Sequence, residues 1–458
     1  MKKNDIVTVT IEDISSEGLG VGRSNGLTLF VKDTIIGDVA EVKVMKMKKT
    51  YGFARLMRLI GEGTDRIEPP CPAAKQCGGC QIQAMSYEAQ LRFKENKVRN
   101  NLVRIGKFEN PPMEPIIGMQ EPFRYRNKAQ FPIGMDREGR LIAGFYAGRT
   151  HAIIECRDCL LGMPVNERIL KQVLAHMERH HIAPYDEQTG AGLVRHVMTR
   201  IGFATGQIMV CLVINGDTLP YEKELTDSLA QISGMTSIML NINKENTNVI
   251  MGRKGKLLWG QEYIEDTIGD VRFRISPLSF YQVNPRQTEK LYGKALEYAG
   301  LTGEETVWDL YCGIGTISLF LAQKAKHVYG VEIVPEAIRD AKQNAELNGM
   351  KNAEFFVGKA EDVLPEKYEK EGIFADVIVV DPPRKGCEES VLDTMVKMQP
   401  KRIVYVSCDS ATLARDLKYL CEHEYRLEKV CPVDMFGNSV HVETVCCLHR
   451  VKSYSLFL

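Results

Sequence analysis

The stretch ETVWDLYCGIGTISLFLAQKAKHVYGVEI, residues 305–333, predicts the fold of the second half of the chain. Residues 305–310 form an apolar strand, a turn with Gly313 and Gly315 follows, and a helix and a second strand come after it. A glycine-rich turn between strand and helix lets the backbone approach a ligand closely. Glu332 closes the second strand about twenty residues on, where a carboxylate accepts hydrogen bonds from ribose hydroxyls. The pattern predicts a doubly wound α/β sheet that binds an adenosyl ligand.

The glycine turn also indicates which adenosyl ligand to expect. It has two glycines and lacks the GxGxxG spacing with which dinucleotide-binding folds hold a pyrophosphate. An adenosyl ligand without a pyrophosphate is S-adenosylmethionine. Strands and helices continue to alternate up to VCPVDMF and HVETVCCL, two final strands that we expect to form a hairpin. We therefore predict a Rossmann-like catalytic domain over residues 276–458.

A cysteine follows another buried strand of this predicted sheet, in YVSCDSATL, residues 405–413. Cys408 lies in the turn after the strand, and a helix begins near Ser410, the expected N-cap. Open parallel sheets bind ligands at the carboxyl ends of their strands, and a helix N-terminus favours a thiolate over a thiol. The alternative for a single cysteine is a small buried hydrophobic residue.

The preceding strand ends in Asp381, Pro382, Pro383 and Arg384. Similar Asp/Asn-Pro-Pro-aromatic motifs occur in methyltransferases that act on amino nitrogens, where the aromatic ring stacks on the target base. Arg384 stands at the aromatic position here. This difference argues against amino methylation and directs attention to Cys408 at the neighbouring strand end.

The first sixty residues predict a small five-stranded β-barrel of the OB-like kind, from short alternating strands separated by turns. Its last part combines aromatic rings with basic side chains: Lys46, Lys48, Lys49, Tyr51, Phe53, Arg55 and Arg58. Such a mixture suits single-stranded nucleic acid, although a solvated barrel face is the alternative. We assign residues 1–60 to the barrel and residues 61–275 to a central domain of mixed α+β character.

Composition limits the function classes only broadly. The 458 residues include 59 basic and 59 acidic ones, so net charge neither demands nor excludes a nucleic-acid partner. No apolar run approaches the length of a membrane span. We expect a cytoplasmic, monomeric protein with no membrane partner, whose 13 cysteines are reduced, metal-bound or catalytic.

Three cysteines in a Pro/Gly-rich loop have the spacing CxxxxxCxxC: Cys71, Cys77 and Cys80. Thiolate ligation of an iron–sulfur cluster needs a fourth ligand, which either Cys156 or Cys159 of HAIIECRDC can supply. Zinc is the alternative, because four thiolates suit it equally well. Radical S-adenosylmethionine enzymes typically use CxxxCxxC instead, so we expect a structural or RNA-orienting centre.

Together these motifs resemble the RNA uracil-C5-methyltransferases, and most closely their bacterial 23S ribosomal RNA group. The resemblance rests on CPAAKQCGGCQ, FYQVN, DLYCGIGT, DPPRKG, YVSCDSATLARD and HVETV, and on the barrel, which is similar to a TRAM domain. It implies Cys408 as nucleophile, Glu443 as proton acceptor and Cys159 as the fourth ligand of a [4Fe-4S] cluster. It also implies four residues that bind S-adenosylmethionine: Gln282, Tyr311, Glu332 and Asp381.

The implied substrate is a loop uridine of 23S ribosomal RNA, bound before the subunit is fully assembled and contacted by the basic end of the barrel. A loop lowers the free energy needed to flip a base from its stack. Three alternatives remain open at this point. They are a methyltransferase for the T-loop uridine of transfer RNA, a base-amine methyltransferase that uses DPPR, and an RNA-binding or redox iron–sulfur protein.

Overall fold

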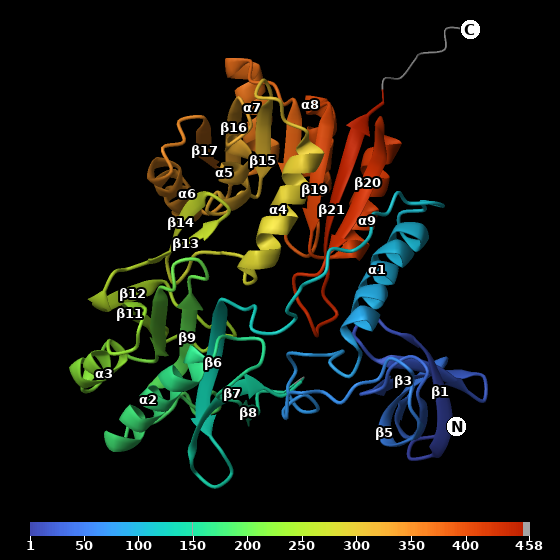
Figure 1. Ribbon diagram of the computed structural model, residues 1–458, viewed down its shortest axis with the longest axis vertical. Coiled ribbons are helices and arrows are strands. Elements are labelled where there is room, and N and C mark those ends of the chain that lie inside the picture. The colour runs from blue at the N-terminus through green and yellow to red at the C-terminus, as the bar shows by residue number, and fades with distance from the viewer. Residues whose placement is uncertain (149, 452–458) are drawn as a thin grey trace.

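The computed structural model describes residues 1–148 and 150–451. Figure 1 shows three parts: a blue barrel at the N-terminus, a green sheet with its helices, and an α/β layer that runs from yellow to red. Within the described ranges, no helix is both long enough and apolar enough to cross a membrane.

The N-terminal barrel has five strands, as predicted, and closes in the order β1-β2-β3-β5-β4. The strands are β1 (Ile6–Ile14), β2 (Gly20–Ser24), β3 (Leu27–Lys32), β4 (Val39–Met47) and β5 (Tyr51–Gly61). Alternate residues point inward, and the fully buried Leu29, Val31 and Val42 form its core. The rings of Phe30, Tyr51 and Phe53 contact one another on its outside, with centroids 5.6–5.7 Å apart.

The central part is a seven-stranded sheet in the order β12-β11-β10-β9-β6-β7-β8. Its strands are β6 (Lys128–Met135), β7 (Leu141–Tyr146), β8 (Ile153–Glu155), β9 (Val194–Ile201), β10 (Ile208–Ile214), β11 (Met235–Ile242) and β12 (Lys254–Gly260). The helices α2 (Val165–Arg179) and α3 (Glu222–Leu229) pack beside this sheet, and a hairpin of β13 (Ile264–Ile268) and β14 (Val271–Ile275) follows it. The mixed α+β character matches the prediction.

The C-terminal sheet has the order β17-β16-β15-β18-β19-β21-β20. The strands are β15 (Thr306–Leu310), β16 (His327–Glu332), β17 (Ala353–Val357), β18 (Val377–Val380), β19 (Arg402–Ser407), β20 (Tyr425–Val433) and β21 (Glu443–Arg450). The first five are parallel, whereas β21 runs antiparallel to both of its neighbours. The doubly wound sheet and the terminal hairpin are thus as predicted, with β21 inserted between β19 and β20.

Both faces of this sheet are buried, which explains why its strands are continuous apolar runs rather than alternating ones. Val307, Val377 and Val404 pack into one apolar cluster, and their neighbours Trp308, Ile378 and others pack into a second cluster on the opposite face. The helices that cover the sheet are α4 (Pro285–Ala299), α5 (Thr316–Ala322), α6 (Pro335–Leu347), α7 (Ala360–Glu371), α8 (Glu389–Met398) and α9 (Ser410–Glu422).

One helix from early in the chain lies against this late sheet. Figure 1 shows α1 (Tyr87–Arg104) beside α9 and β20, and its Val98 and Leu102 belong to the second apolar cluster. After α1 the chain continues along the sheet edge, where Met113 and Ile117 form parallel bridges to β20. Residues 87–117 therefore pack with the C-terminal sheet although they precede the central sheet in sequence.

We predict that breaking one buried ion pair destabilises the barrel. Asp38, fully buried, accepts hydrogen bonds from the guanidinium of Arg66, whose side chain is 12% exposed. Arg66→Met leaves that carboxylate without its cation, and should lower the free energy of unfolding by about 3–5 kcal/mol in urea denaturation. The matched control is Arg58→Met, which removes an exposed pair with Glu41 and should leave the midpoint nearly unchanged. Equal effects of the two variants would contradict the prediction.

Candidate functional site

The predicted site residues line one cavity of about 1190 Å³ at the carboxyl edge of the C-terminal sheet. It contains all six residues proposed for the cofactor and the chemistry: Gln282, Tyr311, Glu332, Asp381, Cys408 and Glu443. The edge includes β15, where the chain connections diverge to β16 on one side and to β18 on the other. Doubly wound sheets bind ligands at such a point.

The pairing of strands explains why Cys408 and Glu443 meet. Ser407, the last residue of β19, pairs with Thr444 in β21. Because the two strands are antiparallel, the residue after β19 lies across from the residue at the start of β21, which is Glu443. Asp381 follows β18, the parallel neighbour of β19, and reaches the same edge. Three chain segments thus place a thiol and two carboxyl groups around one cavity.

The helix after Cys408 has a different N-cap from the predicted one. Asp409, not Ser410, caps α9: its Oδ1 accepts hydrogen bonds from the N–H groups of Ala411 and Thr412 at 2.9 and 3.1 Å. The Ser410 hydroxyl is used elsewhere, because it accepts a hydrogen bond from Asn101 of α1 at 2.8 Å. Aspartate and serine are comparable caps, so this choice depends on the tertiary contact.

The surroundings of Cys408 act against the thiolate that the helix N-terminus favours. Burial, followed by the nearby carboxyl groups of Glu443 and Asp381, raises the pKa of the Cys408 thiol to about 12. Arg384 lowers the pKa of this thiol, but its effect is smaller than the combined effects of burial and the two carboxyl groups. A partly buried thiol beside two acids is held as the neutral form, and the N-terminus of α9 is too weak to reverse that.

The two carboxyl groups are themselves held close to neutrality. Burial and the charge of Asp381 raise the pKa of Glu443 to about 8, although Arg384 lowers it. Burial raises the pKa of Asp381 to about 7. A carboxyl group with a pKa near neutral pH can both hold and accept a proton there, which is what a general base requires.

The four residues expected to bind the adenosyl ligand all line the cavity, and the structure shows what holds two of them. The Glu332 carboxylate accepts the N–H groups of Gly313 at 3.3 Å and Val334 at 3.0 Å, which ties the glycine turn to the end of β16. Gln282 is 8% exposed, and its backbone carbonyl accepts a hydrogen bond from Asn127 at 3.0 Å.

Several lining residues were not singled out from the sequence: Gln81, Arg126, Phe280, Phe436, Ser439 and His441. His441 stands two positions before Glu443, so its place in the HVETV motif was an available signal. Phe280 opens FYQVN and is 71% exposed at the cavity. Gln81 ends the CPAAKQCGGCQ motif, which was its available signal, whereas Arg126 carried no local signal because it comes from a loop far away in sequence.

Comparison with known proteins identifies the family. The model of the tRNA (uracil-5-)-methyltransferase family matches residues 86–451, and that of the TRAM domain matches residues 2–57. The chain belongs to this family of RNA uracil-C5-methyltransferases. It is 54% identical to an uncharacterized RNA methyltransferase of Halalkalibacterium halodurans and 50% identical to one of Listeria monocytogenes; each alignment covers 98% of both chains.

A solved structure is similar over nearly the whole length. The tRNA (uracil-54, C5)-methyltransferase of Pyrococcus abyssi, in complex with S-adenosyl-L-homocysteine, is 25% identical with a TM-score of 0.77. The match covers 96% of this chain and 100% of that one. Barrel, central sheet and catalytic sheet thus occur together in this family member and in the archaeal enzyme.

The structure of this family member also brings the two cysteine segments side by side. Cys77 forms an antiparallel bridge with Ala147, and the Gly78 N–H donates to the Tyr146 carbonyl at 3.3 Å. The chain turns back through β8, directly before the cysteines of HAIIECRDC. The glycines of the first cysteine loop line the cavity that holds Cys408, so the loop forms part of its wall.

The thiols in these segments are electrostatic neighbours. Burial and three other thiols raise the pKa of Cys80 to about 12; those thiols belong to Cys159, Cys77 and Cys71. Cys156 and Cys159 interact with each other, so that one of the two thiols ionises more readily than the other, and backbone N–H groups and Arg126 lower the pKa of Cys159.

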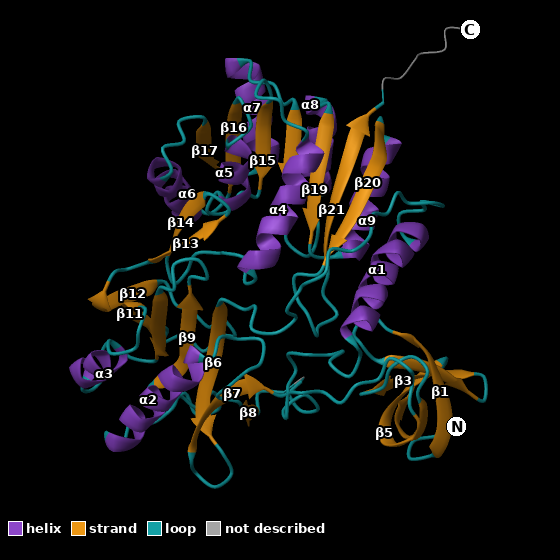
Figure 2. Cartoon of the chain, in the orientation of Figure 1, coloured by secondary structure: helices purple, strands orange, loops and turns teal. Residues whose placement is uncertain are grey.

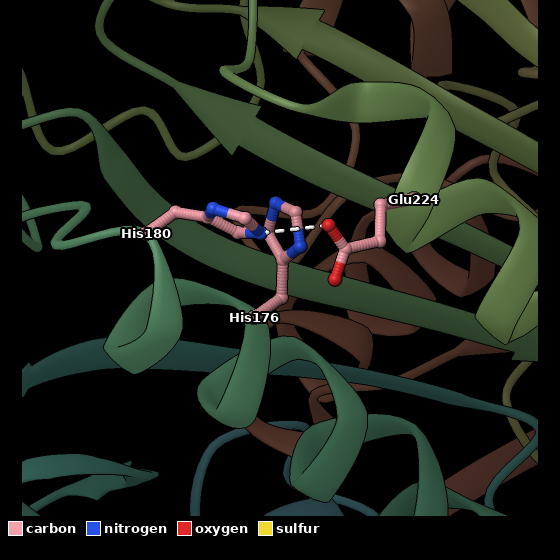
Figure 3. A group of neighbouring side chains, drawn as sticks. All are labelled: His176, His180 and Glu224. Carbon is pink, nitrogen blue, oxygen red and sulfur yellow. Dashed lines mark hydrogen bonds and ion pairs between the residues drawn. The ribbon is translucent and has the colours of Figure 1, made fainter.

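Another group of metal-ligand side chains lies in the central part. Figure 3 shows His176 of α2, His180 directly after that helix, and Glu224 of α3 pointing toward one another, with ligand atoms within 4.8 Å. Each has a protein partner: His176 Nε2 contacts the Pro220 carbonyl at 3.1 Å, and His180 Nε2 contacts Glu224 at 3.0 Å. Because Arg179 also pairs with Glu224, we interpret the group as a polar contact between two helices.

The buried carboxyl group predicts a dependence of stability on pH. The folded pKa of Glu443 is about 8, against an ordinary value of 4.5, so between these pH values the folded protein keeps a proton that the unfolded chain has lost. Its contribution to stability therefore falls as pH rises through this window. We expect Glu443→Gln to raise the melting temperature at about pH 8 and to change it little at about pH 5. Equal melting temperatures at the higher pH would contradict this.

Proposed function

We propose that the protein methylates carbon 5 of a uridine in RNA through a covalent adduct with Cys408. The observation that carries the proposal is the register of β19 and β21, which places a cysteine opposite a buried glutamate at one cavity. Substitution at carbon 5 requires a nucleophile on one side of the ring and a base on the other. The cavity volume of about 1190 Å³ exceeds that of most single-ligand sites and leaves room for a flipped base beside a cofactor.

The proposed chemistry begins with the ring. Carbon 5 of uracil is too weak a nucleophile to accept a methyl group unaided. Cys408 loses its thiol proton to solvent, Sγ adds to carbon 6, and the ring electrons move to carbon 5 and O4 as an enolate. S-adenosylmethionine, when bound, supplies the methyl group that bonds to carbon 5 and is left as S-adenosylhomocysteine. Glu443 then accepts the proton from carbon 5, the double bond between carbons 5 and 6 re-forms, and the Cys408 sulfur leaves as a thiolate.

The electrostatics of the cavity support these roles. Arg384 lowers the pKa of both Cys408 and Glu443, so it favours the charged form of the nucleophile and of the base. Among the groups that act on the Cys408 thiol, Arg384 is thus the cation that opposes the effect of the Glu443 and Asp381 carboxylates. We assign S-adenosylmethionine binding to the four residues that line the rest of the cavity: Gln282, Tyr311, Glu332 and Asp381.

We propose a loop uridine of 23S ribosomal RNA as the substrate. The barrel offers an exposed basic surface for the phosphates, formed by Lys46, Lys48, Lys49 and Arg55. It lies next to the contacting rings of Phe30, Tyr51 and Phe53, on which unstacked bases can pack. The second candidate is a uridine of transfer RNA, which the archaeal tRNA (uracil-54, C5)-methyltransferase favours by its similarity over the whole chain.

We further propose that Cys71, Cys77, Cys80 and Cys159 hold a [4Fe-4S] cluster. A single tetrahedral zinc ion at about 2.3 Å from each sulfur needs sulfurs about 4 Å apart. Within the described part of the chain, no three of these sulfurs lie within 4.8 Å of one another. Three thiols in one loop and a fourth from a second segment suit a [4Fe-4S] cluster, and zinc is the alternative. When bound, the cluster would hold the first cysteine loop, which forms part of the cavity wall, against the segment that contains Cys159.

Covalent trapping tests the reaction and its substrate. With 5-fluorouridine in the RNA, carbon 5 has no proton to lose after methyl transfer, so the protein should remain bound as an adduct on a denaturing gel. We expect adducts with 23S ribosomal RNA fragments, none with Cys408→Ala, and unchanged S-adenosylmethionine affinity in that variant. Cys421→Ala, in α9, is the matched control and should react normally. Methylation by Cys408→Ala would overturn the mechanism, and faster adduct formation with transfer RNA would select the second substrate.

The cluster has its own test. Protein purified without oxygen should show the broad visible absorption of iron–thiolate charge transfer, with iron and sulfide in the cluster ratio. Cys71→Ser and Cys159→Ser should lose this absorption, whereas Cys156→Ser should retain it. Bound zinc without iron would contradict the proposal.

A further inference from the structure

The loop that joins β20 and β21, residues 434–442, connects the candidate base to the rest of the cavity. It starts after Val433, which pairs with Glu443 across the hairpin. It also contributes Phe436, Ser439 and His441 to the cavity. Hairpin loops of this length are usually mobile unless other parts of the structure hold them. The position of this loop therefore sets the positions of these three lining side chains, and it bears on Glu443 because the loop ends where Glu443 begins β21.

Contacts from one face of α1 hold the loop. Four polar residues of α1 at helical spacing reach it: Tyr87, Gln90, Lys94 and Lys97. Gln90 Oε1 accepts the Asn438 N–H at 2.8 Å, and its amide donates to the Asn438 side chain at 3.2 Å. Lys97 donates to the Val440 carbonyl at 2.9 Å.

The centre of these contacts is a fully buried ion pair. Lys94 and Asp434 both have 0% exposed side chains, and Lys94 Nζ lies 2.5 Å from Asp434 Oδ1. Lys94 also donates to the Phe436 carbonyl at 2.9 Å, and Asp434 accepts the Phe436 N–H at 3.1 Å and the Tyr87 hydroxyl at 2.8 Å. Every charged atom of the pair thus has a partner within the loop or in α1.

A buried ion pair of this kind contributes little net stability compared with apolar residues of the same size. What it does provide is a single geometry, because moving either partner leaves a buried charge uncompensated. We propose that Lys94 is a positioning residue for the reaction: through Asp434 it holds loop 434–442 so that Glu443 faces the ring bound by Cys408. This inference rests on the proposed function, since it assigns Glu443 as the base.

The first variant to test it is Lys94→Met, which keeps the aliphatic stem and removes the charge. In single-turnover reactions with unmodified 23S ribosomal RNA fragments and transfer RNA transcripts, we expect product release to slow by about 10- to 100-fold, as small misplacements of catalytic groups do. The covalent adduct should accumulate, as we also expect for Glu443→Gln, which cannot remove the carbon-5 proton, while S-adenosylmethionine affinity stays unchanged.

Two further variants separate positioning from stability. Val98→Ala removes a fully buried side chain one turn further along α1, where it packs in the apolar cluster, so it should lower the melting temperature without adduct accumulation. Lys94→Met combined with Asp434→Asn removes both charges and keeps hydrogen-bonding atoms at position 434. The double variant should melt closer to the native enzyme than Lys94→Met does. Its product release should remain slow, because the charged link to α1 is still missing.

The outcomes distinguish this inference from the proposed function. If the native enzyme forms a Cys408-dependent adduct but Lys94→Met turns over like the native enzyme, the positioning role is wrong and the function stands. Recovery of turnover together with melting temperature in the double variant would also reject positioning. If the native enzyme methylates neither RNA, or Cys408→Ala remains active, the proposed function fails and the inference fails with it.

Discussion

The antiparallel pairing of β21 with β19 is the constraint on which the candidate site depends. All other neighbours within the first five strands of this sheet are parallel, so their carboxyl ends collect at one edge. An antiparallel strand brings its amino end to that same edge, and Glu443 is the first residue of β21. The hydrogen-bond ladder thus places Glu443 opposite Cys408, a residue that lies in a separate turn of the chain.

Cys408 and Glu443 lie among buried ionisable groups, so desolvation affects their protonation. Two carboxyl groups and a thiol share a cavity with Arg384, and desolvation raises the pKa of all three. Desolvation therefore acts against the charged form of each group, and Arg384 acts in the opposite direction on Cys408 and Glu443.

The parts of the chain that precede the catalytic sheet contribute directly to the cavity. The first cysteine loop forms part of its wall, Arg126 leads into β6, and α1 holds the loop before β21. The barrel joins this assembly through an apolar cluster that includes Ala89 of α1 and Val440 of the same loop. The barrel is therefore in physical contact with the loop that carries the cavity residues.

Local sequence was sufficient to predict the secondary-structure elements. The barrel strands and the glycine turn between β15 and α5 follow from periodicity and turn residues within short windows, whereas Glu443 was implied by the family resemblance of HVETV. These features depend on near neighbours, so a window of sequence contains the information for them.

The surroundings of the site residues depend on tertiary contacts, which the local sequence does not contain. Asp409 caps α9, whereas the Ser410 hydroxyl is hydrogen-bonded to Asn101 of α1. Burial beside two acids raises the pKa of the Cys408 thiol, which favours its neutral form. Lys94 and Asp434 are 340 positions apart, and no local pattern connects them. Burial and the distance between charges set pKa values and cavity walls, and both exist only after distant segments have packed together.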